Sequence, residues 1–179
     1  AAALGYSEES GTPYETALIR NHYVKRTFIE PAQSIRNFGV KVKHNPMRDF
    51  LEGKRIVLVD DSIIRGTTLK KIVGMLRNSG AREVHLRISA PPSIASCHYG
   101  IDTPTSSELI AANHTSEEIC AIMGADSLGY LSLEGLHDVS DRHIKRGICD
   151  ACFSKRYPVP IDGSGQVPQL SLFRDIEEE

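Results

Sequence analysis

The sequence lacks a strong excess of charge, and it lacks a long apolar run. Its formal net charge is −2 over 179 residues, so electrostatics gives no reason to expect binding to nucleic acid or to an anionic membrane. No apolar run approaches the ~20 residues that a membrane-spanning helix needs. The first residues also lack the basic start and apolar core of a signal peptide. The composition therefore predicts a cytoplasmic protein without nucleic-acid or membrane partners.

Cysteine is scarce, and an initiator methionine is missing. Four cysteines in 179 residues do not make a disulfide scaffold, and in the cytosol they indicate metal or redox chemistry. The chain begins with three alanines, which resemble the middle of a helix. We therefore expect it to be the C-terminal part of a longer protein.

What the sequence does contain is one stretch, Arg55 to Thr68, that joins a strand to a candidate binding loop. The apolar run from Ile56 to Val59 is short and rich in β-branched residues, which predicts a strand buried on both faces of a parallel sheet. Asp60 and Asp61 follow at its carboxyl end, where open α/β sheets bind their ligands. Gly66 then leads into a helix whose first N–H groups suit a phosphate. The stretch thus predicts a site for a phosphorylated sugar.

Adjacent acidic residues are also common in solvated surface turns, which is the alternative interpretation of Asp60 and Asp61. Their position directly after an apolar strand, and just before a Gly-Thr-Thr helix start, favours a site. Successive side chains of an extended segment point to opposite sides. One carboxylate would then face a ribose diol or Mg²⁺ while the other supports it.

The flanking segments predict alternating helices and strands. Leu69, Ile72, Val73 and Leu76 have helical spacing before the stop at Asn78-Ser79-Gly80, and residues 83–89 alternate like a half-buried strand. Thr105 with Glu108, and Thr115 with Glu118, have the spacing of capping boxes. The other predicted elements are a helix over 1–10 ending at Gly11, strands over 14–19 and 128–133, and a helical turn over 134–139.

Residues 21–49 show no periodicity and carry many basic residues, among them Lys25 and Arg26. A connection of this length inside a domain is usually functional or mobile. Two interpretations remain open here. The segment is either a solvated basic loop or a lid that brings positive charge to a phosphorylated substrate.

The cysteines form a second constellation. Cys149 and Cys152 are two residues apart, so both thiolates can bind one metal, although a redox pair and a partial zinc site fit the spacing equally well. Cys97 is distant in sequence. Cys120 lies in a helical apolar pattern, and we interpret it as a core thiol.

Residues 57–68 resemble the phosphoribosyl pyrophosphate (PRPP) motif of the type I phosphoribosyltransferases. That motif alone would indicate only some phosphoribosyltransferase. Further blocks, in the same order over residues 1 to about 158, resemble the glutamine PRPP amidotransferases, in their iron–sulfur-containing branch. These blocks are Ser10–Tyr14, Tyr23–Pro31, Gly80–His85, Cys97–Asp102, Glu108–Ala112 and Tyr130–Gly135.

The resemblance implies an α/β fold, a type I phosphoribosyltransferase-like parallel sheet flanked by helices, followed by an irregular cysteine-containing C-terminal tail. It implies a phosphoribosyltransferase domain over 1–140, incomplete at its N-terminus, with a lid at about 23–46. A cluster-binding tail would occupy 141–179. The family's glutaminase domain would be absent, so we expect the isolated chain to be inactive with glutamine.

The resemblance also implies an activity, in which ammonia from glutamine displaces pyrophosphate from PRPP and gives 5-phosphoribosylamine, the first committed step of purine synthesis. Asp60 and Asp61 would hold the ribose hydroxyls and Mg²⁺. Arg26, on the lid, would be the catalytic residue, and Lys25 departs from the glycine usual beside it. The remaining substrate-binding residues would be Ser62 and the 5′-phosphate cradle of Arg65, Gly66, Thr67 and Thr68.

In the family's iron–sulfur branch, Cys97, Cys149 and Cys152 match three of the four ligands of a [4Fe–4S] cluster. The fourth ligand would lie outside this chain. Two departures near the cluster are Ser96, where proline is usual, and Lys155, where glycine is usual. The implied partners are PRPP, ammonia or glutamine through the missing glutaminase domain, purine nucleotides as feedback inhibitors, and further copies of the chain in a homo-oligomer, a tetramer by resemblance.

Two alternative functions stay open. A PRPP-sensing regulator without catalysis would need a nucleic-acid-binding module, and the sequence has neither a helix-turn-helix pattern nor a net basic domain. A base-salvage phosphoribosyltransferase would leave the paired cysteines and the C-terminal blocks unexplained.

Overall fold

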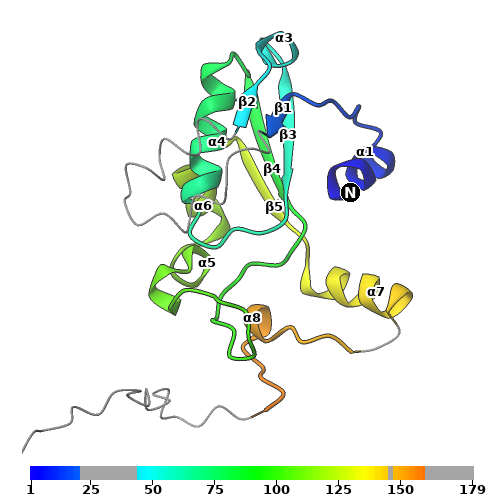
Figure 1. Cartoon of the computed structure of the whole chain (residues 1–179), viewed down its shortest axis with the longest axis vertical. Helices are drawn as coiled ribbons and strands as arrows, with labels where there is room; N and C mark the ends of the chain where they lie inside the picture. The colour runs from blue at the N-terminus through cyan, green and yellow to red at the C-terminus, as the bar shows by residue number, and fades with distance from the viewer. Residues whose placement is uncertain (21–43, 145–146, 160–179) are drawn as a thin grey trace, which may run out of the picture.

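The computed structural model describes residues 1–20, 44–144 and 147–159. Its centre is a three-stranded parallel sheet in the order β3-β4-β5, formed by Arg55–Asp60, Glu83–Ile88 and Ser127–Tyr130. Helices α4 (Thr67–Asn78) and α6 (Ser116–Met123) cover one face of this sheet, and α1 (Ala2–Ser10) lies near β3 on the other side (Figure 1). The described part therefore has the predicted α/β architecture.

The β3–α4–β4 unit forms because its apolar residues match the period of each element. The four apolar residues predicted for the helix are all buried in α4, and α4 ends at Asn78 as expected. On β4 every second residue is buried, namely Val84, Leu86 and Ile88. Burying these side chains together with Ile119 and Met123 of α6 makes the core.

Strand β3 differs from the prediction in its burial. We expected it to be buried on both faces, but Ile56 to Asp60 are all only half-buried. Among the described residues β3 pairs only with β4, so it is an edge strand in this part of the chain. Only one face of β3 packs against the core, through Ile56 and Leu58.

A small antiparallel pair precedes the sheet. Strand β1 (Leu18–Arg20) pairs with β2 (His44–Pro46), and α3 (Arg48–Leu51) follows. The observed strand is thus shorter than the one predicted over 14–19 and begins later in the sequence, because its pairing with β2 begins only at Leu18. The backbone of Met47 donates a hydrogen bond to Ala17 O at 2.9 Å, which closes this pair.

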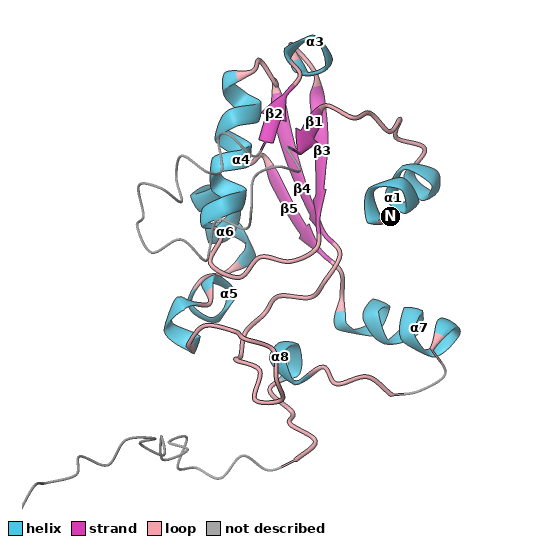
Figure 2. Cartoon of the chain, in the orientation of Figure 1, coloured by secondary structure: helices cyan, strands magenta, loops and turns pink. Residues whose placement is uncertain are grey.

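The helices between β4 and β5 are short (Figure 2). A 3-10 turn, η2 (Ser106–Glu108), precedes α5 (Ile110–Asn113) and α6. The capping box of Thr115 and Glu118 is present at the start of α6, as predicted. The other predicted box is wrong, because the Glu108 side chain binds Arg65 and Thr105 makes no cap.

The C-terminal elements also differ in length from the prediction. Strand β5 stops at Tyr130, because Ser132 caps the helix α7 (Leu133–His143) by accepting from Gly135 N at 3.0 Å. The helix is longer than the turn predicted over 134–139. It also runs across residues 140 and 141, where the sequence predicted the boundary between the phosphoribosyltransferase domain and the C-terminal tail. A further short helix, α8 (Ala151–Ser154), begins between the two paired cysteines and ends before Lys155, in a segment expected to be irregular.

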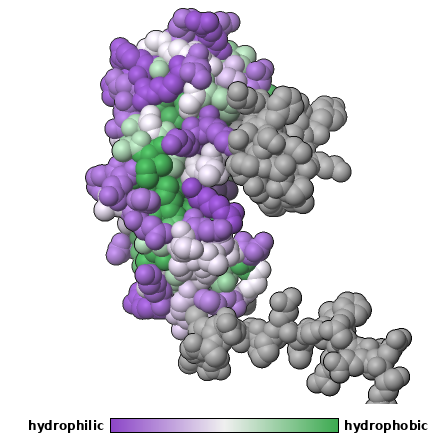
Figure 3. Space-filling model, turned by 90° about the vertical axis from the view of Figure 1, so that its left-hand side faces the viewer, coloured by the Kyte–Doolittle hydropathy of each residue, from purple (hydrophilic) through white to green (hydrophobic). Residues whose placement is uncertain are grey.

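The surface seen from the α4 side is largely hydrophilic, with a hydrophobic strip between the polar side chains (Figure 3). Within the described ranges, none of the helices has both the length and the apolar character needed to cross a membrane.

Candidate functional site

The carboxyl ends of β3 and β4 are tied together at the two aspartates. The backbone N–H and the hydroxyl of Ser89 both donate to Asp60 O, at 2.9 and 3.2 Å. Asp61 N donates to Asp60 Oδ1, and the Ser62 hydroxyl donates to Asp61 Oδ1, each at 2.9 Å. Asp60 is half-buried and Asp61 is exposed. Local hydrogen bonds thus orient two adjacent carboxylates at the edge where parallel sheets bind ligands.

The loop then turns into α4 at Gly66, which is buried and has φ +73°. This left-handed conformation favours glycine. No side chain caps the helix at Gly66, and Thr67 and Thr68 are exposed in its first turn. Because the first N–H groups of a helix have no intrahelical acceptor, they and the two hydroxyls make a ready site for a phosphate.

A segment distant in sequence packs behind this loop, and α5 lies beside it (Figure 1). Ile110 N donates to Ile64 O at 2.9 Å. The Glu108 carboxylate accepts from Arg65, and a Cβ placed on Gly66 would collide with the methyl group of Met123. The loop is therefore supported from outside its own strand–helix unit.

The cysteine-containing segments also meet. Ile94 N and Ala95 N donate to Cys152 O at 2.9 and 3.0 Å, which places the loop of Cys97 beside α8. Burial raises the pKa of the Cys152 thiol, and the nearby charges of Cys97 and Cys149 raise that pKa further. The structure thus places the loop that contains Cys97 beside the segment of Cys149 and Cys152. All four cysteines are free thiols.

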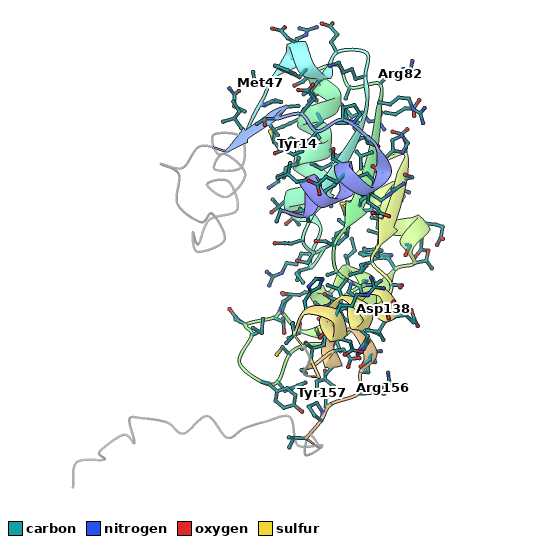
Figure 4. All side chains as sticks on the ribbon, turned by 90° about the vertical axis from the view of Figure 1, so that its right-hand side faces the viewer. Tyr14, Met47, Arg82, Asp138, Arg156 and Tyr157 are labelled. Atoms are coloured by element: carbon teal, nitrogen blue, oxygen red, sulfur yellow. The ribbon has the colours of Figure 1, made fainter. Side chains whose placement is uncertain are left out.

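Arg156 and Tyr157, which follow α8, lie at the end of the molecule opposite Met47 and Arg82 (Figure 4). The Tyr157 hydroxyl donates to Ser96 O at 2.7 Å. Asp150 accepts from the Ser154 hydroxyl at 2.8 Å and pairs with His137 Nε2 at 2.9 Å; these two contacts lower the pKa of its carboxyl. The second contact ties α7 to the cysteine segment, and sequence reasoning gave no signal for it.

Two further residues behave differently from the rest of this region. Cys120 donates to Ala125 O at 3.3 Å and burial raises its pKa, but it is only half-buried in α6, where we expected a core thiol. Lys155 has φ +60° at the end of α8, a left-handed conformation that glycine adopts most easily. This is the position where the resembling family usually has glycine.

The donor sets of the two candidate metal sites differ in how complete they are. Among residues 1–20, 44–144 and 147–159, no three His, Cys, Asp or Glu side chains stand close enough to form a metal site as they are placed. A pair of carboxylates suffices for Mg²⁺, which takes one or two carboxylates plus substrate phosphates. A [4Fe–4S] cluster needs four thiolates, and this region supplies three. Arg26, Lys25 and most of the predicted lid lie outside the described residues.

Comparison with known proteins first defines the class. Residues 11–93, which contain β3, the loop and α4, match the family model of the phosphoribosyl transferase domain. The carboxylate pair and phosphate-suited loop therefore lie in a phosphoribosyltransferase fold.

The particular family follows from relatives that match nearly the whole chain. Amidophosphoribosyltransferase 1, chloroplastic, of Arabidopsis thaliana is 56% identical over 158 residues, covering 88% of this chain and 28% of the relative. The amidophosphoribosyltransferase of Bacillus subtilis is 52% identical over 172 residues, covering 94% and 36%. A solved structure of the glutamine PRPP amidotransferase from B. subtilis, complexed with ADP and GMP, has 51% identity and a TM-score of 0.78, covering 91% and 36%. The chain belongs to the amidophosphoribosyltransferase family, and it spans about a third of the length of these relatives.

Proposed function

We propose that the protein containing this chain transfers ammonia derived from glutamine to PRPP, forming 5-phosphoribosylamine and pyrophosphate in purine biosynthesis. The chain would carry the PRPP-binding part. The observation on which this rests is one short segment at the end of β3 that presents two carboxylates next to a helix start suited to a phosphate. The names and high identity of the relatives support the same function.

In this proposal the segment binds PRPP at both ends. Asp60 and Asp61 hold the ribose hydroxyls and Mg²⁺, which when bound would neutralise charge on the departing pyrophosphate. Ser62 orients Asp61 through its 2.9 Å hydrogen bond. Gly66, Thr67 and Thr68 receive the 5′-phosphate on N–H and hydroxyl donors.

Fixed geometry is what such a site contributes to the reaction. Displacement at a sugar carbon depends on holding the two reactants in line and on stabilising charge in the transition state, more than on proton transfer. The lid over about 23–46, with Arg26, would close over the substrate and exclude water that competes with ammonia. Purine nucleotides would act as feedback inhibitors.

The test is the pair of substitutions Asp60→Asn and Asp61→Asn in the full-length protein. Calorimetric titration should show binding of Mg·PRPP to the wild type and none to the double variant, with circular dichroism unchanged. Equal binding by both proteins would refute the role of the aspartates. A separate assay of pyrophosphate release that depends on both PRPP and glutamine distinguishes the transferase from a PRPP sensor and from a salvage enzyme that uses free bases.

We further propose that Cys97, Cys149 and Cys152 are ligands of a [4Fe–4S] cluster whose fourth ligand lies outside this chain. The hydrogen bonds from Ile94 N and Ala95 N to Cys152 O, which hold the loop of Cys97 beside α8, support it. Full-length protein purified without oxygen should carry iron and sulfide and absorb visible light. Cys152→Ala should abolish these signals, and Cys120→Ala, the matched control in α6, should retain them. Zinc in place of iron, or a Cys152→Ala variant with its cluster intact, would contradict this assignment.

A further inference from the structure

The ion pair between Arg65 and Glu108 joins the phosphate-suited loop to a turn 43 residues away. Arg65 Nε and Nη2 both donate to Glu108 Oε2, at 3.1 and 2.5 Å. The two side chains are 53% and 47% exposed. The exposed pair of Arg48 with Glu52 joins neighbours in sequence. The Arg65 pair instead connects two distant segments, so it restrains their relative position.

The residues on both sides of Arg65 are held from the same direction. Ile64 O accepts from Ile110 N at 2.9 Å. A Cβ on Gly66 would lie 3.2 Å from Ile110 Cδ1 and closer still to Met123. Three consecutive loop residues are therefore each contacted by the segment 108–123.

The magnitude of these contacts indicates where their effect would be measured. An ion pair as exposed as this one contributes little to the stability of the fold, because water screens both charges. A binding loop is more sensitive, because a displacement of about 1 Å weakens several donor–acceptor contacts with the ligand together. The pair should therefore influence ligand binding more than stability.

We propose that Glu108 is a positioning residue for phosphate binding, which acts by fixing Arg65 and with it the loop over 62–66. In this proposal Arg65 mainly anchors the loop to Glu108, whereas the resemblance led us to expect that Arg65 contacts the phosphate directly. The inference rests on the proposed function, because it assigns the 5′-phosphate of PRPP as the group that the loop receives.

The two possible roles of Arg65 predict different changes in PRPP affinity for the substitution Glu108→Gln. If Arg65 binds the phosphate directly, Glu108→Gln removes a competing carboxylate and leaves PRPP binding unchanged or tighter. If Glu108 positions the loop, the same change weakens binding by about tenfold, the effect of losing a hydrogen bond between charged groups. The measurements are KM for PRPP and kcat, with a calorimetric Kd for Mg·PRPP, all in the full-length protein.

A rise of about tenfold in KM and Kd with kcat within about twofold of the wild type supports the positioning role. Glu52→Gln is the matched control, since it breaks the exposed Arg48 pair at the end of α3 and should leave all three values unchanged. Arg65→Lys keeps the positive charge but loses the two-nitrogen contact. It should weaken binding as Glu108→Gln does, which gives a second test if Glu108→Gln does not fold.

The outcomes separate the two proposals. Failure of the wild type to bind Mg·PRPP refutes the proposed function, and the role of Glu108 with it. Binding by the wild type with equal or tighter binding by Glu108→Gln overturns the positioning role alone. Wild-type affinity in Arg65→Lys likewise overturns it.

Discussion

Replacing Gly66 by alanine would disturb the loop at its most closely packed point. Gly66 has φ +73°, and a left-handed conformation costs a residue with a Cβ about 1–2 kcal/mol. The new methyl group would also collide with the terminal methyl group of Met123, a flexible side chain that is 2% exposed and would have to shift within the core. Overpacking of this kind adds about 1–3 kcal/mol. We expect Gly66→Ala to destabilise the chain by about 2–5 kcal/mol.

Gly124 provides a matched control, because it has φ +72° and no atom lies within 4 Å of the point that a Cβ would occupy. Gly124→Ala should therefore show only the backbone part of the cost, about 1–2 kcal/mol. Urea unfolding of the 179-residue chain, followed by circular dichroism, gives both values, and calorimetry should show loss of Mg·PRPP binding only for Gly66→Ala. Equal destabilisation by the two substitutions would show that the packing behind Gly66 is not tight, and the reasoning would fail.

Three further substitutions test other contacts. The Asp126 carboxylate accepts from Val84 N at 2.6 Å and, second in importance, from Arg77, and both contacts lower the pKa of the carboxyl group. The stability that these contacts provide is therefore complete above the pKa of Asp126 in the unfolded chain, and it is lost as the pH falls through the lower pKa in the folded chain. Asp126→Asn should destabilise the fold by about 1 kcal/mol at neutral pH and by less in acid. A difference in urea midpoint between wild type and variant that stays constant from neutral pH into acid would contradict this. Lys155→Gly should raise stability by about 1 kcal/mol, because the left-handed end of α8 suits glycine; a lower midpoint would refute the strain. Thr115→Ala should cost about 1 kcal/mol through loss of the α6 capping box, measured the same way, and an unchanged midpoint would show that the cap contributes nothing.

The sequence was informative where the structure depends on neighbouring residues. The helical spacing of Leu69, Ile72, Val73 and Leu76 predicted the buried side of α4, and alternation predicted β4. The capping box at Thr115 was also found, because both partners lie within four residues. Local periodicity and capping chemistry are sufficient for such elements.

Contacts between distant segments were not predictable in the same way. Glu108 has the spacing of a capping residue with Thr105, but its carboxylate binds Arg65 instead. The bond between His137 and Asp150 likewise joins two elements with no shared local pattern. Cys97 was grouped with Cys149 and Cys152 only through the resemblance, and the hydrogen bonds from Ile94 N and Ala95 N to Cys152 O bring its loop beside α8. A single sequence records which side chains are available, while the fold decides which of them meet.

The register of the sheet connects the core to the candidate site. Strand β4 is the central strand, and its buried residues fix its position against α4 and α6. Ser89, which follows β4, donates two hydrogen bonds to Asp60 O, and Leu131 N donates to Ile88 O at 2.8 Å. The ends of all three strands are thereby aligned at one edge. Asp60 is positioned by the most buried strand, whereas the phosphate-suited loop beside it is held both by buried residues such as Ile63 and Met123 and by the exposed contact of Glu108. Core substitutions should therefore affect stability and carboxylate position together, whereas substitution of the exposed Glu108 should affect the loop with little change in stability.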